Sequence, residues 1–277
     1  MENLLDLTMS AMKANILDIN GKLRSELEMQ SAFEEPVRED IIRRAVLAES
    51  SLALQPQAHS VMAGIQTTAS YFGAMSSYRT GRHVGHAIRP KEKLGGGVQG
   101  KVRRIPSAVK GRRAHPHMVE KILVERINLK EYRKALRSAV AATASNSYVK
   151  RKPEGVQLPI IISDEIEAVP KTKSIMNIMK NLKLSSFIES CKASKHIKRG
   201  RSGNERHYRK SVLLVVSRKD APAIKAARNI AGADACDVHS IKAGLLAPGG
   251  MPGRLVVWSE SAFKSIDTAI EGISRVG

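Results

Sequence analysis

The feature that most limits how this chain can fold is an acid-poor stretch, residues 50–119, in which Glu92 is the only carboxylate. Eleven lysines and arginines lie between Arg79 and Arg113, so the stretch carries +10 of the chain's formal net charge of +20. Glycines separate these cations, and the few apolar residues follow neither a strand nor a helix period. Because such a segment has little apolar surface to bury, we expect one long, extended, basic internal loop.

The remainder of the chain can form a folded body. Its 277 residues are 42% hydrophobic, enough for one sizeable core or two small ones. The net charge of +20 indicates a polyanionic partner, with nucleic acid the first candidate and a membrane surface the second. No apolar run approaches the ~18 residues that span a bilayer, and no signal-peptide pattern is present. We therefore expect a cytoplasmic protein without a membrane partner.

Short apolar runs alternate with helical patterns in the second half of the chain. Unbroken apolar runs are typical of strands buried on both faces of a parallel sheet. The alternation predicts an α/β, three-layer, Rossmann-like body with a mainly parallel sheet. The expected strands are residues 158–163, 212–217 and 255–258, and the expected helices are residues 171–182, 221–231 and 260–271.

The first half adds a strand at residues 12–19 and a helix that runs from residue 35 to residue 52. Asn128 and Glu131 have the spacing of a capping box, which predicts the start of another helix. We expect a single α/β domain of residues 12–277, with residues 57–119 inserted as an extension and residues 1–11 outside the core. Both Met1 and Met12 fit as the first translated residue.

The glycines at residues 95–100 match two nucleotide-binding patterns, the dinucleotide fingerprint and most of a phosphate-binding loop. Both patterns need a strand before them and a helix after them. Here Lys101 is followed by Val102 instead of Ser or Thr, and Pro106 prevents a helix. We interpret these glycines as places where the backbone can approach RNA phosphates, and we expect no cofactor.

Candidate RNA-binding residues fall in two basic patches, the loop and a second patch at residues 192–210, which we expect to be another loop facing nucleic acid. We interpret the turn-rich segment before the last strand, residues 247–254, as a structural connection, with Arg254 as a further candidate for an RNA contact. Cationic and imidazole side chains suit phosphates and bases. The candidates in the two patches are Arg79, Arg82, His83, Arg89, Lys91, Lys93, Lys101, Arg103, Arg104, Lys110, Arg112, Arg113, His115, Lys198, Arg199, Arg201, Arg206, Arg209 and Lys210.

Catalytic and metal chemistry find no support in the sequence. The histidines near both patches match no zinc-ligand spacing. No nucleophile elbow or carboxylate pair is present. Two cysteines, Cys191 and Cys236, are too few for a disulfide framework, and we expect them to be reduced and inert.

Four motifs, in order, resemble the archaeal and eukaryotic form of the large-subunit ribosomal protein L-four family. The resemblance covers nearly the whole chain from Met12. The motifs are RRIP at 103–106 with VKGRRAHP at 109–116, RSAVAAT at 137–143, ARNIAGA at 227–233, and LAPGG at 246–250 continuing to Arg254.

This resemblance implies a globular domain on the outer surface of the large ribosomal subunit, and an extension that threads the ribosomal RNA toward the polypeptide exit tunnel. It places residues 103–113 on the returning limb of the extension. The implied partners are large-subunit ribosomal RNA, neighbouring ribosomal proteins and the nascent chain near the tip. The tip candidates are Thr80, Gly81, Gly85, Gly95, Gly96 and Gly97.

The residues and the resemblance together predict a structural, non-enzymatic component of the large ribosomal subunit. Two alternatives stay open at this point. One is a nucleotide-dependent RNA-processing enzyme, and the other is an RNA-binding regulator of translation.

Overall fold

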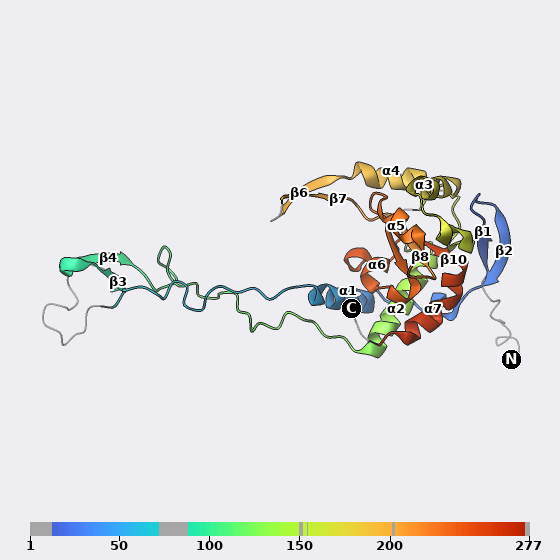
Figure 1. The fold of residues 1–277 in the computed structure, drawn as a ribbon. Helices are drawn as coiled ribbons and strands as arrows, with labels where there is room; N and C mark the ends of the chain where they lie inside the picture. Colours follow the sequence, from blue (N-terminus) through green and yellow to red (C-terminus); the bar gives the residue numbers. More distant parts are fainter. Residues whose placement is uncertain (1–12, 72–87, 150–151, 154, 201–202, 275–277) are drawn as a thin grey trace, which may run out of the picture. The chain divides into compact units, whose positions relative to one another are not determined.

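The computed structural model describes residues 13–71, 88–149, 152–153, 155–200 and 203–274 (Figure 1). The chain divides into two compact units. The first, here called the body, comprises Met1–Ala53 and Val124–Gly277. The second, here called the arm, is Leu54–Leu123.

The body is built on a six-stranded sheet with the strand order β2-β1-β5-β10-β8-β9. The β1–β2 pair is antiparallel, and every other neighbouring pair is parallel. This confirms the prediction of a mixed α/β fold with a mainly parallel sheet. The strands are β1 (Lys13–Leu17), β2 (Leu23–Glu28), β5 (Ile160–Ile162), β8 (Leu213–Val216), β9 (Asp234–Asp237) and β10 (Val256–Ser259).

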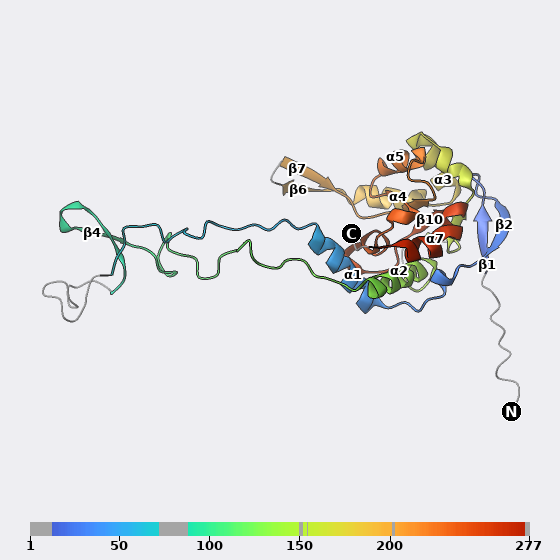
Figure 2. The same cartoon turned by 60° about the horizontal axis from the view of Figure 1, so that its bottom comes forward.

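Two apolar cores lie on the two faces of this sheet, because successive side chains of a strand point in opposite directions. Trp258 packs in the first core with residues of α1, α2, α6 and α7. Its neighbour Val257 packs in the second core with residues of α3, α4 and α5. Figure 2 shows helices on both sides of the strands. The helices are α1 (Glu39–Leu52), α2 (Leu129–Ala144), α3 (Thr172–Asn181), α4 (Ser185–Ala193), α5 (Pro222–Arg228), α6 (Ala243–Leu246) and α7 (Glu260–Gly272).

Five 3-10 turns complete the described secondary structure: η1 (Ser31–Phe33), η2 (Gly95–Gly97), η3 (Asp164–Ala168), η4 (Val238–Ser240) and η5 (Pro248–Gly250). Within the described ranges, no helix is both long enough and apolar enough to cross a membrane. Cys191 and Cys236 are both free thiols, and both are buried. Burial raises the pKa of the Cys236 thiol to about 12, so this thiol stays protonated and inert.

The capping box predicted at Asn128 is wrong in its chemistry, although α2 does begin at the next residue. Asn128 is the N-cap, but its side chain makes no capping hydrogen bond. Glu131 instead pairs with Arg44 on α1, with Oε1 and Nη1 2.8 Å apart. The carboxylate therefore joins two helices of the first core.

Arg254 is buried, so its prediction as an RNA contact is wrong. Its side chain is 3% exposed and its Nη2 lies 2.7 Å from Asp234 Oδ2. Its Nε donates to the carbonyl of Ser211 at 3.0 Å and its Nη1 to that of Leu245 at 2.9 Å. A buried guanidinium needs such a set of acceptors, and here it joins the segment before β8 to β9 and α6.

The second basic patch is a β-hairpin, where the sequence predicted a loop. Strand β6 (His196–Gly200) pairs antiparallel with β7 (Gly203–His207), and His196 lies opposite His207. Most side chains of both strands are exposed. The hairpin therefore holds its register through backbone pairing, without an apolar face in a core.

The arm contains one short antiparallel pair, β3 (Lys91–Lys93) with β4 (Gln99–Val102). The bridge between Ser70 and Lys91 adds a further residue to this pair. Outside these strands and η2, the described residues of the arm form neither helices nor strands. The arm lies in the chain between α1 and α2.

Candidate nucleic-acid interface

Two limbs of the arm, residues 54–70 and 103–123, contact each other at several places between residues 59–69 and residues 104–117. Both views show them side by side (Figures 1 and 2). The rings of His59 and His117 meet edge to face at 5.9 Å. Closer to the hairpin β3–β4, Arg104 Nη1 donates to the carbonyl of Ala69 at 3.1 Å. The limbs therefore form a paired element within the arm.

Gly64 lies close to the backbone of the other limb. Its φ is +75°, and an added Cβ would lie 2.7 Å from the backbone nitrogen of Arg112. A side chain there would collide with backbone, which only glycine avoids. The fit fixes the backbone of Arg112, whose side chain is exposed.

The glycine run at residues 95–100 is the turn of the hairpin β3–β4. Gly95–Gly97 form η2, Gly96 has φ +71°, and strand β4 begins at Gln99, after Val98. A nucleotide-binding loop requires a helix at that point. The structure therefore removes the context that either nucleotide pattern needs.

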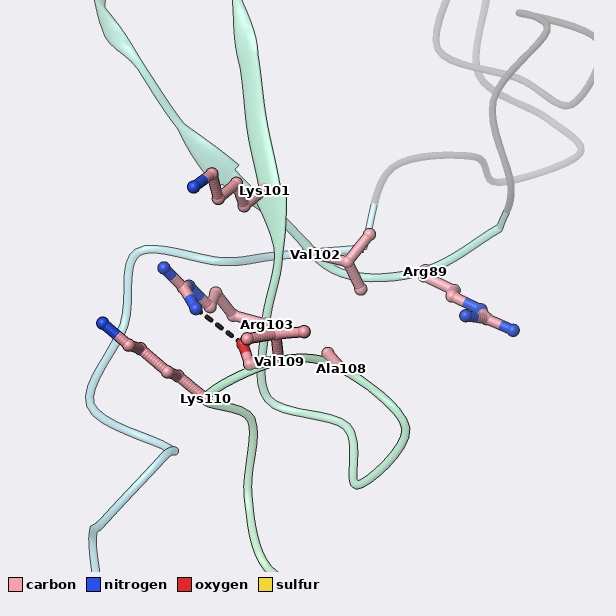
Figure 3. Close-up of a pocket in the computed structure, with 7 residues that line it drawn as sticks. All are labelled: Arg89, Lys101, Val102, Arg103, Ala108, Val109 and Lys110. Carbon is pink, nitrogen blue, oxygen red and sulfur yellow. Dashed lines mark hydrogen bonds between the residues drawn. The ribbon is translucent and has the colours of Figure 1, made fainter.

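A pocket of about 440 Å³ lies at the base of this hairpin (Figure 3). Figure 3 shows the side chains of Lys101, Arg103 and Lys110 extending to one side of the ribbon, and Arg89 to the other. Lys101, Lys110 and Arg89 are exposed. The lining residues are Arg89, Lys101, Val102, Arg103, Ala108, Val109 and Lys110.

Arg103 organises this pocket from within. Its Nε donates to Glu92 Oε1 at 2.7 Å, and its Nη1 donates to the carbonyl of Val109 at 2.6 Å. The side chains of Arg103 and Glu92 are only 18% and 26% exposed. The single carboxylate of the acid-poor stretch thus holds one arginine in place, and this arginine holds the returning limb.

A tight turn at residues 105–111 positions Lys110. Ala108 N donates to the Ile105 carbonyl at 3.1 Å, and Gly111 N donates to the Ala108 carbonyl at 3.0 Å. Lys110 has φ +59°, and a Cβ added to Gly111 would lie 2.1 Å from the Ile105 oxygen. The turn closes only with glycine at residue 111.

The predicted site residues of the arm fall into four groups. Arg103 and Arg104 are bound to other arm residues, as described. The tip candidates Gly95, Gly96 and Gly97 form the turn of the β3–β4 hairpin, and Lys91 and Lys93 lie on β3. Arg89, Lys101, Lys110, Arg112, Arg113 and His115 are exposed. Arg79, Thr80, Gly81, Arg82, His83 and Gly85 lie outside the described residues.

The hairpin β6–β7 carries the second group of predicted cations. Lys198 lies opposite Glu205, and Arg199 lies opposite Asn204. The stacked rings of His196 and His207, 5.5 Å apart, close its root. Lys198, Arg199, Arg206 and Arg209 are exposed, whereas Arg201 lies outside the described residues.

Lys210 differs from the other cations because it is part of an ion-pair network. Its Nζ lies 3.0 and 2.9 Å from the two oxygens of Asp234, which also pairs with buried Arg254. Burial alone would raise the pKa of Asp234, but hydrogen bonds and charge from Lys210 and Arg254 outweigh burial and lower it. Asp234 therefore stays ionised, and two cations neutralise it.

These surfaces are suited to binding a polyanion. In the part of the chain that the structure describes, no group of three or more His, Cys, Asp or Glu side chains could hold a metal ion. The sequence drew attention to the cations but missed the role of Glu92. The sequence did contain a signal for this role, because Glu92 is the only carboxylate among eleven basic residues. A single carboxylate in such a segment attracts the cations around it.

Comparison with known proteins agrees with this picture over most of the chain. Residues 27–269 match the family described as ribosomal protein L4/L1. Three archaeal relatives are each named large ribosomal subunit protein uL4. The one from Methanoculleus marisnigri is 39% identical over 262 residues, 92% of this chain and 99% of the relative. The one from Archaeoglobus fulgidus is 40% identical over 260 residues, 91% of this chain and 96% of the relative.

The third relative, from Methanocaldococcus jannaschii, is 38% identical over 266 residues, 94% of this chain and 100% of the relative. Each match therefore includes both body and arm. With a family match over residues 27–269 and such identity across both units, the chain belongs to the ribosomal protein L4/L1 family, in its archaeal type.

Proposed function

We propose that this protein is a structural constituent of the large ribosomal subunit, which binds ribosomal RNA mainly through its arm. The observation that carries the proposal is the arrangement of charge on the arm. Most of its described basic side chains are exposed, and internal contacts fix the backbone that carries them. The carboxylate of Glu92 already accepts a hydrogen bond from Arg103. Phosphates are the partners that such a surface fits. The role is non-catalytic and belongs to translation, in the cytoplasmic ribosome with its neighbouring proteins.

The mechanism is electrostatic and geometric. Exposed cations such as Arg89, Lys101 and Lys110 neutralise phosphates, and the hairpin β3–β4 together with the turn at residues 105–111 keeps the spacing of these cations constant. A preorganised surface loses less conformational entropy on binding than a disordered one. Within this proposal, Arg103 and Arg104 act by shaping the arm, and the outward cations contact RNA.

We also propose that the arm is an extension inserted into one Rossmann-like domain. The expected limits, residues 57–119 within residues 12–277, lie close to the unit Leu54–Leu123. The strand order β2-β1-β5-β10-β8-β9 supports the comparison with doubly wound sheets. In this proposal the body supplies stability and the extension supplies most RNA contacts.

We propose further that the tip of the extension lies beside the nascent chain in the exit tunnel. Each limb has about 30 residues, and at ~3.3 Å per residue its reach is limited to ~100 Å, enough to cross a substantial RNA layer. Small residues suit a tip beside a passing polypeptide, and Thr80, Gly81 and Gly85 are of that kind. The limbs would meet RNA and the tip would meet the nascent chain.

The RNA-binding proposal is tested by the salt dependence of binding to a large-subunit RNA fragment. With roughly 6 to 10 phosphate contacts, affinity should fall about 10³- to 10⁵-fold between 50 and 200 mM salt. A triple variant, Arg89→Gln with Lys101→Gln and Lys110→Gln, should lower the logarithmic salt slope by about 2 to 3.

The matched control removes three charges from exposed lysines of the body, Lys22→Gln, Lys173→Gln and Lys180→Gln. A smaller change in slope is expected there. Equal changes in both triple variants would reject the arm as the main RNA-binding surface.

The tunnel proposal is tested by photo-crosslinking in ribosomes stalled on a nascent chain. A photoreactive residue at position 80 should label the nascent chain. The same residue at position 225, an exposed site on α5, should not. Labelling only from position 225, or from neither position in fully assembled ribosomes, would reject the tunnel role and leave RNA binding untouched.

A further inference from the structure

A second cavity lies in the body, at the root of the hairpin β6–β7. Its volume is about 730 Å³, within the ~300–1,000 Å³ range of pockets that hold small ligands. Residues from α3, α4, α5 and β7 line it, together with the loop that leads into β9. Four elements of the body thus meet around one opening.

Three exposed cations from three elements surround this cavity. They are Lys192 on α4, Arg206 on β7 and Arg228 at the end of α5. Among the described residues, none of these three forms an ion pair with a carboxylate. Asp234 also lines the cavity, but Lys210 and Arg254 neutralise it. The opening therefore has an excess of positive charge available to an anion.

The wall of the cavity has a different character. Tyr208 and His207 present half-buried rings, Met176 is half-buried, and Ile188 is 3% exposed. Flat rings and apolar side chains are surfaces on which an unpaired base can stack. A ligand with a planar, partly apolar group and an attached anion matches both the wall and the cations.

We infer that this cavity receives an unpaired nucleotide of the bound RNA, a contact that rests on the proposed function. The base lies against Tyr208, His207 and Met176, and its flanking phosphates meet Lys192, Arg206 and Arg228. RNA is favoured over a free nucleotide because the cations continue beyond the cavity, at Arg209 and along the hairpin. Phosphates on either side of the inserted nucleotide would contact Arg209 and the cations of the hairpin.

The test is photo-crosslinking of the full-length protein to single-stranded RNA that contains 4-thiouridine, followed by peptide mapping. This readout separates labelling of the body from labelling of the arm. Labelling of the segment with Tyr208 should fall at least fivefold in Arg228→Gln and stay unchanged in Lys225→Gln. Both substitutions remove one exposed cation of α5, but Lys225 does not line the cavity. Labelling of the arm should be the same in both variants.

A second pair of variants examines the stacking surface. Tyr208→Phe should retain the label and Tyr208→Ala should lose it, with the thermal unfolding midpoint measured to confirm that both fold. Equal labelling of Arg228→Gln and Lys225→Gln, or labelling confined to the arm, would overturn the inference and leave the proposed function standing.

Two further outcomes separate the sources of the ligand. If excess uridine monophosphate removes the body label without changing the arm label, the ligand is a free nucleotide, and the inference about RNA is wrong. If neither arm nor body is labelled, the proposed function itself fails.

Discussion

Removing Glu92 should weaken RNA binding, although its charge repels RNA. Glu92→Ala deletes the only carboxylate of the acid-poor stretch. On charge alone, the variant should bind a polyanion more tightly. The structure predicts the opposite sign, because Glu92 holds Arg103 at 2.7 Å and Arg103 in turn holds the returning limb through the Val109 carbonyl.

The magnitude follows from two opposing terms. A hydrogen bond to a charged group, such as that between Arg103 and Glu92, contributes ~1.5–3 kcal/mol. Without it the arm is less ordered before binding, so ordering the arm on RNA costs a similar free energy. Relief of repulsion from a phosphate ~7 Å away in water amounts to ~0.6 kcal/mol. The difference is roughly 1–2 kcal/mol, which weakens binding about 5- to 30-fold.

The assay is equilibrium binding of the full-length protein to a large-subunit RNA fragment at fixed salt. Glu92→Gln keeps an acceptor and should fall between the parent and Glu92→Ala. Glu120→Ala is the control, since Glu120 is an exposed arm carboxylate that forms no ion pair with any described residue. The control should bind as well as the parent or up to about 3-fold more tightly. Tighter binding by Glu92→Ala would refute the organising role of Glu92.

Two further predictions concern the arm's turn and the body's buried ion pair. Gly111→Ala should weaken RNA binding without changing the unfolding midpoint of the body, because the added Cβ would lie 2.1 Å from a backbone oxygen. Gly95→Ala should bind RNA normally, because an added Cβ there has no atom within 4 Å. Equal affinities would contradict this reasoning. Asp234→Asn should destabilise the body by ~3 kcal/mol in denaturant unfolding, because Arg254 would be left buried and unpaired, while Lys210→Gln should cost less than ~1 kcal/mol. The pKa of Asp234 is lower in the folded protein than in the unfolded chain. Ionised Asp234 therefore stabilises the fold at pH values above its pKa in the unfolded chain, and this stabilisation is lost as pH falls through its pKa in the folded protein. The deficit of Asp234→Asn should therefore close below about pH 4, and a deficit independent of pH would exclude this linkage.

The sheet was predictable wherever strands are buried on both faces. Residues 158–163, 212–217 and 255–258 were expected as strands, and β5, β8 and β10 lie within or next to those limits. Burial on two faces requires an unbroken apolar run, which a single sequence displays directly. Helices α3, α5 and α7 alternate with these strands as expected.

Elements whose stability comes from partners elsewhere in the chain were missed. Strand β9 has only Ala235 and Cys236 between two aspartates, and it forms by pairing with β8. The hairpin β6–β7 has a charged sequence and a register set by backbone pairing, so no apolar alternation marks it.

The candidate site was predictable in its charge and not in its geometry. The sequence located the cations but could not distinguish exposed Lys101 and Lys110 from Arg103, which is bound to Glu92. It also counted Arg254 as a candidate RNA contact, because a buried arginine and an exposed one look alike without their partners. Such distinctions depend on contacts between distant residues, here Arg254 with Asp234 and with the carbonyl of Ser211.

In the proposed function, the arm anchors this protein in the large ribosomal subunit. The most direct measurement is sedimentation of ribosomal subunits from cells that express either the tagged full-length protein or its variant with Arg89, Lys101 and Lys110 changed to glutamine, after a high-salt wash. The parent protein should remain with large subunits, and the variant should be depleted from them. Recovery of the parent protein only at the top of the gradient, or equal retention of both proteins, would contradict this anchoring role of the arm.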